Sequence, residues 1–151
     1  MSEALYCIDT TVWIKATTGE EPRETGEVAK QVVARALLRG RLVLPAWAWA
    51  EVASVLRKKV RARLLQADEA ERVWRMFLEL PIDFIEMRSL RRRAWEIADA
   101  FGLPTLYDAA FLACTELAPA PEDTVREFWT ADDSLLRSLG NRRPAYVRRL
   151  A

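Results

Sequence analysis

Brief apolar runs alternate with longer amphipathic segments along most of the chain. Four runs stand at 4–9, 41–45, 82–87 and 125–131, with the sequences ALYCID, RLVLP, IDFIEM and VREFWTA. Each is short and contains β-branched or aromatic residues, as buried strands do. We therefore predict four strands, and PAYVRRL near the end of the sequence is a candidate fifth strand.

The segments between these runs have the apolar spacing of helices. They cover 25–40, 46–60, 67–80, 89–102 and 105–117. Strands separated by helices favour a mostly parallel sheet that helices cover on both faces. We expect an α/β fold with a central sheet of four to five strands.

The length of the chain fits one domain, which we place at residues 1–151. Hydrophobic residues make up 51% and charged residues 30%, as in a soluble globular protein. The sequence has no apolar stretch long enough to cross a bilayer, and its start does not resemble a secretion signal. We expect a cytoplasmic protein with no membrane partner.

Histidine is absent from the whole sequence, which excludes every mechanism that needs imidazole as a base, an acid or a metal ligand. The two cysteines, Cys7 and Cys114, both stand among apolar residues. Free cysteines in such places usually behave as small buried hydrophobic residues in a reducing compartment. We expect neither a disulfide nor a zinc site.

Two aspartates directly follow predicted strands. Asp9 follows the first strand and Asp132 the fourth. In an open parallel sheet, ligands bind beyond the carboxyl ends of the strands, so both are candidates for a binding site. Each could instead cap a helix. Asp108 has the same alternative, because Thr105 and Asp108 have the spacing of a capping box.

The fourth candidate acid, Glu51, lies within a predicted helix. Helical geometry places Trp49, Val52 and Leu56 on one face of that helix and Glu51 on its polar flank. A solvated position on the flank is the alternative to a functional role.

The four acids together favour a metal site. Two stand at strand ends and two in first turns of helices, so they could meet over one edge of the sheet. Their mutual repulsion would then call for a cation. Oxygen ligands suit Mg²⁺ or Mn²⁺, which promotes displacement at phosphorus by activating a water molecule.

At this point the sequence resembles the PIN-domain nucleases and, within them, the VapC-type toxins of toxin–antitoxin pairs. Four stretches carry the resemblance in the order of the family: CIDTTVWIK, PAWAWAEVASVLRKK, GLPTLYDAAFLACTE and FWTADDSLLRSL. The residues that match the four acids of the family are Asp9, Glu51, Asp108 and Asp132. Thr11 and Thr130 match its supporting hydroxyl residues.

The resemblance implies a PIN-like three-layer sandwich and Mg²⁺- or Mn²⁺-dependent cleavage of single-stranded RNA. Asp9 and Asp108 would bind the metal directly, and Glu51 and Asp132 partly through water. A homodimer and a small antitoxin protein that inhibits the enzyme are also implied. Two alternatives remain: a PIN nuclease of RNA processing that is not a toxin, and a PIN-like module that binds RNA or protein without cleaving it.

The net charge of +1 gives no strong overall attraction to nucleic acid, but cations cluster locally. We predict that the cluster after Glu51 contacts the RNA backbone through Arg57, Lys58, Lys59 and Arg61. Asp133 stands next to Asp132 and could take its role. Trp13 and Trp47 lie near the first two acids, and we expect them in the core or in a dimer interface rather than stacked on bases. The loop between the third and fourth acids could form one wall of the site.

Overall fold

Five parallel strands form the central sheet, in the order β3-β2-β1-β4-β5. The computed structural model describes residues 3–18 and 22–150. The strands are β1 (Ala4–Ile8), β2 (Gly40–Pro45), β3 (Ile82–Ile85), β4 (Val125–Thr130) and β5 (Val147–Arg149). The four predicted strands and the candidate fifth are confirmed, as is the predicted parallel sheet.

Seven α-helices and one short 3-10 helix connect the strands in the part of the chain that the structure describes. They are α1 (Thr10–Thr18), α2 (Arg23–Arg39), α3 (Ala48–Arg61), α4 (Ala67–Leu78), α5 (Arg88–Phe101), α6 (Tyr107–Leu117), α7 (Asp133–Leu139) and η1 (Gly140–Arg142). The predicted helices correspond to α2 to α6. The helices α1 and α7 were not among the predicted segments, because short helices show too few turns for a clear apolar period. They were considered only in the alternative that Asp9 and Asp132 cap helices.

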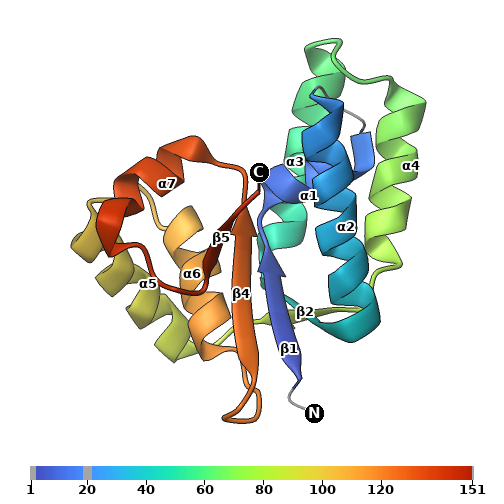
Figure 1. Cartoon of the computed structure of the whole chain (residues 1–151). Helices are drawn as coiled ribbons and strands as arrows, with labels where there is room; N and C mark the ends of the chain where they lie inside the picture. Colours follow the sequence, from blue (N-terminus) through green and yellow to red (C-terminus); the bar gives the residue numbers. More distant parts are fainter. Residues whose placement is uncertain (1–2, 19–21, 151) are drawn as a thin grey trace.

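The helices form layers on both sides of the sheet. In Figure 1, α1 to α4 lie on one side of the strands, and α5, α6 and α7 lie on the other. The predicted three-layer sandwich is therefore confirmed. Of the helices within residues 3–18 and 22–150, none has the length and apolarity needed to span a bilayer.

The centre of the core lies where α6 packs against β1, β2 and β4. Every residue of α6 from Ala109 to Thr115 is buried. A helix that is apolar all round belongs in an interior, which explains why a buried helix follows Asp108 directly. Cys7 and Cys114 are both buried and free, as predicted.

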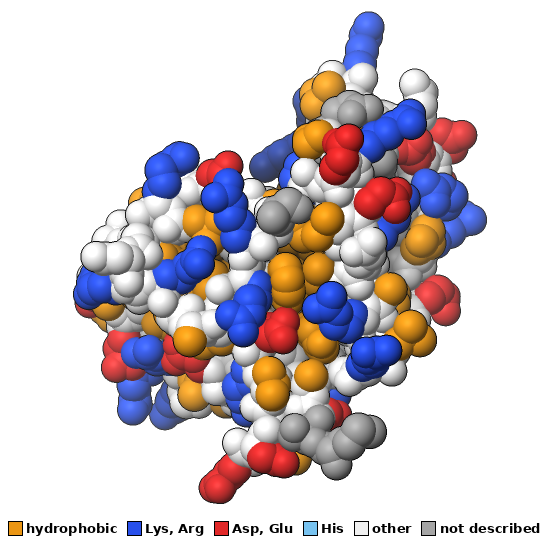
Figure 2. Space-filling view, in the orientation of Figure 1, with side chains coloured by type: hydrophobic (Ala, Val, Ile, Leu, Met, Phe, Trp, Pro, Cys, Tyr) orange, Lys and Arg blue, Asp and Glu red, His pale blue; other side chains and the backbone are white. Residues whose placement is uncertain are grey.

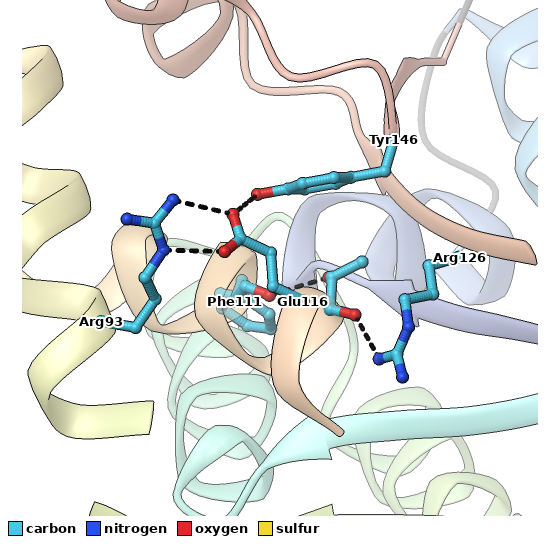
Figure 3. Close-up of polar contacts among 6 residues, drawn as sticks. Arg93, Phe111, Glu116, Arg126 and Tyr146 are labelled. Carbon is cyan, nitrogen blue, oxygen red and sulfur yellow. Dashed lines mark hydrogen bonds and ion pairs between the residues drawn. The ribbon is translucent and has the colours of Figure 1, made fainter. Parts of the chain in front are cut away.

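A cluster of polar side chains attaches the end of the chain to α5 and α6 (Figure 3). The Arg93 Nε lies 2.7 Å from Glu116 Oε1, and the Tyr146 hydroxyl donates a hydrogen bond to Glu116 Oε2. Burial, followed by the bond to Glu116, raises the pKa of Tyr146 well above its ordinary value. These contacts fix the residue before β5, so they help to position the last strand beside β4.

The first residue of β2, Gly40, has no room for a side chain, because the Tyr6 ring and the Ala4 carbonyl pack against its Cα. A Cβ atom on Gly40 would lie 2.5 Å from Tyr6 Cε2 and 2.7 Å from the carbonyl oxygen of Ala4. We expect Gly40→Ala to lower the free energy of unfolding by about 2 kcal/mol, measured by urea denaturation. The cost should shrink in part in a Tyr6→Leu background, because the ring contacts are lost there while the contact with the Ala4 carbonyl remains. An equal cost in both backgrounds would assign the penalty to the Ala4 carbonyl and not to Tyr6.

Candidate active site

The predicted acids come from four places along the chain, at or near one edge of the sheet. Asp9 follows β1, and its backbone N–H donates to the Trp129 carbonyl of β4 over 3.1 Å. Asp132 follows β4 by two residues, and Glu51 and Asp108 lie in the first turns of α3 and α6. In Figure 1 this edge lies at the heads of the strand arrows, between α7 on one side and α1 with α3 on the other.

Asp9 is the most deeply buried of these acids, with 3% of its surface exposed. Its carboxylate accepts hydrogen bonds from the hydroxyls of Thr11 and Thr130 and from the Val12 N–H at 3.3 Å. Burial raises the pKa of Asp9 to about 7, although the three hydrogen bonds oppose this rise. The charge of Asp108 raises the pKa further. Asp9 also caps α1 through Val12, so the capping alternative describes part of its role.

Asp108 is partly buried at the start of α6. Burial raises its pKa to about 6, and the charges of Asp132 and Glu51 add to the rise. The predicted capping box with Thr105 is wrong: α6 has Leu106 as its N-cap residue, and no side chain caps the helix. The helix begins too late for Asp108 to be the third residue after the cap, so a carboxylate is kept there without a capping bond.

Glu51 lies near the start of α3 and accepts a hydrogen bond from the hydroxyl of Thr10. Thr10 is 6% exposed. Sequence reasoning missed Thr10, although its place directly after Asp9 was a usable signal. The predicted apolar face of α3 is confirmed for Val52 and Leu56, but it is wrong for Trp49, which is 49% exposed.

Asp132 is the N-cap residue of α7. Its Oδ1 accepts hydrogen bonds from Ser134 N at 2.9 Å and Leu135 N at 3.2 Å. Its own N–H donates to the hydroxyl of Thr130 at 3.0 Å, and that hydroxyl donates to Asp9. Thr130 therefore connects the first and fourth predicted acids.

The neighbours of these acids have distinct roles. Asp133 is exposed and forms an ion pair with Arg149 at 3.2 Å, away from the bonds that Asp132 makes. Trp13 is 2% exposed and packs edge-on against Phe77, so the core prediction is confirmed for Trp13. Trp47 packs edge-on against Phe111 and Tyr107.

Two other sequence expectations concern surfaces around the site. The loop between α6 and β4 precedes β4, so it lies at the opposite edge of the sheet from Asp9 and does not form a wall of the site. The basic cluster of α3 begins six residues after Glu51. At 1.5 Å per residue, Arg57 lies about 9 Å and Arg61 about 15 Å farther along the helix axis. Their contact with RNA stays a prediction.

The donor set of the site fits a hard divalent cation. Its candidate ligands are carboxylate oxygens, which Mg²⁺ and Mn²⁺ prefer, and a cation would offset the repulsion that raises the pKa of Asp108. Within the described residues, no three His, Cys, Asp or Glu side chains converge closely enough to hold a metal ion. Their oxygens instead accept hydrogen bonds from threonine hydroxyls and backbone amides. Metal binding would require these bonds to be exchanged or shared.

Comparisons with known proteins agree with this fold. The sequence model described as "PIN domain" matches residues 6–137. One similar solved structure is a toxin–antitoxin complex from Klebsiella pneumoniae, with 20% identity, 97% of this chain and 96% of that chain covered, and a TM-score of 0.61. Another is VapBC2 from Rickettsia felis bound to a DNA fragment from its promoter, with 12% identity, 97% and 99% covered, and a TM-score of 0.60. No curated protein sequence matches the chain.

Proposed function

The chain belongs to the PIN-domain family, and from this premise we propose that it is a Mg²⁺- or Mn²⁺-dependent endoribonuclease that cleaves single-stranded RNA. PIN-domain proteins are nucleases, which supports phosphodiester hydrolysis as the broad reaction class. We further propose that this nuclease is the toxin of a toxin–antitoxin pair.

The observation that carries the proposal is the placement of the acids at or near one edge of the sheet, where their charges act on one another. Burial contributes most to the raised pKa values of Asp9 and Asp108; Asp132 and Glu51 add to the rise for Asp108, and Asp108 adds to that for Asp9. Carboxylates that repel one another lower the stability of a fold, and a bound cation would offset that repulsion. With no histidine in the sequence, carboxylates are the natural ligands for a hard metal ion.

Each acid then has a defined task. Asp9 and Asp108 would hold the cation directly, and Glu51 and Asp132 would act partly through water. The hydroxyls of Thr11 and Thr130 keep the Asp9 carboxylate in one orientation through their hydrogen bonds. When bound, the cation would make water a better nucleophile and would stabilise the negative charge that develops on the phosphate.

The proposed partners follow from the same premise. The two solved structures named above are toxin–antitoxin complexes, and we propose that a small antitoxin protein inhibits this chain as well. We also propose a homodimer, a cytoplasmic location, and a single PIN domain over residues 1–151. A small neighbouring gene for a DNA-binding protein would support the toxin over a nuclease of RNA processing.

Cleavage of a fluorescent single-stranded RNA tests the proposed reaction. We expect the purified chain, freed of any bound partner, to cut the RNA with Mg²⁺ or Mn²⁺ and not with EDTA. The products should carry 5′-phosphate and 3′-hydroxyl ends, which enzymatic ligation can verify. Inactivity on both structured and unstructured RNA with Mn²⁺ present would overturn the proposal.

A further inference from the structure

Three arginines from separate segments surround one hollow beside the candidate active site. Arg137 comes from α7, Arg143 follows η1, and Arg149 ends β5. Together with Leu136 and Asp133 they line a hollow of about 420 Å³. Its volume exceeds that of a single phosphate group, so it has room for part of a nucleotide.

The hollow lies at the same edge of the sheet as the acids. β5 pairs with β4 in parallel, with Arg149 opposite Thr130, and the Leu150 N–H donates to the Thr130 carbonyl at 2.8 Å. Thr130 also hydrogen bonds to Asp9. Arg149 is therefore one strand away from the group that orients the most buried acid.

The hollow carries more positive charge than its surroundings neutralise. Asp133 is its one carboxylate, and it pairs with Arg149 at 3.2 Å while both side chains stay more than half exposed. Among residues 3–18 and 22–150, Arg137 and Arg143 form no ion pair. Arg41, Arg75, Arg91 and Arg93, by contrast, each pair with a carboxylate. Figure 2 shows Lys and Arg side chains gathered over α7 and β5.

We propose that Arg137, Arg143 and Arg149 form a subsite for a backbone phosphate of the nucleic acid, next to the phosphate that is cut. Guanidinium groups bind phosphate oxygens through paired hydrogen bonds. The inference rests on the proposed function, because the carboxylates beside the hollow repel a polyanion and the arginines offset that repulsion. It adds a binding surface distinct from the predicted cluster on α3.

Asp133 has a specific place in this proposal. Its carboxylate forms an ion pair with the Arg149 guanidinium, which is the group that a phosphate would bind. Asp133 therefore competes with the nucleic acid for Arg149. Asp133→Asn should therefore strengthen RNA binding about threefold at low salt, which is the scale of one exposed ion pair.

RNA binding without cleavage is the direct test. The parent protein carries Asp108→Asn, and fluorescence anisotropy with a labelled single-stranded RNA gives Kd at several KCl concentrations. We expect Arg137→Gln, Arg143→Gln and Arg149→Gln each to weaken binding about fivefold at low salt. Each should also reduce the slope of log Kd against log salt by about 0.7, as expected for one lost phosphate contact. Arg72→Gln on α4 is the matched control with the same change of charge.

A second measurement locates the phosphate. A set of RNAs each carries one uncharged methylphosphonate linkage at a different position. One of these RNAs should bind the parent protein more weakly than unmodified RNA does. The same linkage should not weaken binding to the Arg143→Gln variant. If Arg149→Gln does not fold, Arg149→Lys replaces it in the test. Arg149→Lys should keep the slope of log Kd against log salt but bind RNA more weakly, because lysine lacks the paired donors of arginine.

The results separate the subsite from the function on which it rests. If the wild type cuts RNA but the three variants bind like Arg72→Gln, the subsite is wrong and the nuclease remains. If the variants lose an acidic protein partner and keep RNA binding, the hollow belongs to that partner and the proposal is overturned. If the wild type neither binds nor cuts RNA, both proposals fail.

Discussion

Asp108→Asn is expected to reduce RNA cleavage by at least about 100-fold while the protein stays folded. Asparagine keeps the size of the side chain and removes the charge that a cation requires. No capping bond is lost, because Asp108 does not cap α6. Removing a partly buried carboxylate with a pKa near 6 also relieves repulsion from Asp132 and Glu51, so the melting temperature should not fall at pH 8.

Cleavage rates with Mg²⁺ and Mn²⁺ check this result, with thermal melting as the test of folding. The matched control is Asp99→Asn, the same exchange at an exposed position of α5, which should cut like the wild type. Equal cleavage by the wild type and Asp108→Asn would assign the activity to a contaminant or to another site. If Asp108→Asn does not fold, Asp108→Ser, which also lacks the charge, takes its place in the same assay.

Asp9→Asn is expected to make the fold more stable at alkaline pH and to leave it nearly unchanged near pH 4. The pKa of Asp9 is about 7 in the folded chain, whereas an aspartate in an unfolded chain has a pKa of 3.8. The folded state therefore binds this proton more tightly than the unfolded state. Its contribution to stability is complete below about pH 4 and is lost as the pH rises through 7. Asparagine does not titrate, so the gain at pH 8 has an upper bound on the order of 4 kcal/mol.

Urea denaturation of both proteins from pH 4 to pH 8, with EDTA present, measures the difference. The gap in the free energy of unfolding should widen as the pH rises. Adding Mg²⁺ or Mn²⁺ at pH 8 should stabilise the wild type and have much less effect on Asp9→Asn, because a ligand of the folded state shifts the equilibrium by mass action. A constant gap at every pH would show that Asp9 is already ionised in the fold.

The local pattern of the sequence was sufficient for most of the framework. Apolar runs such as 41–45 predicted strands, and helical spacing predicted α2 to α6. Such patterns depend on neighbours within a few residues, which is why α1 and α7, with few turns of their own, escaped them. The rule that ligands lie beyond strand ends was enough to nominate Asp9 and Asp132 as candidates.

The order of the strands decided what the local pattern does not contain. Placing β4 next to β1 brings Thr130 to Asp9, 121 positions away in the sequence, and pairing β5 with β4 brings Arg149 opposite Thr130. The start of α6 at Tyr107 removed the capping role predicted for Asp108. The sequence by itself therefore determined the strands and the longer helices, because these follow from short-range periodicity, and it nominated the acids from their places in those elements. Only the tertiary structure decided which charges act on one another, because burial and electrostatic coupling depend on distances between remote parts of the chain.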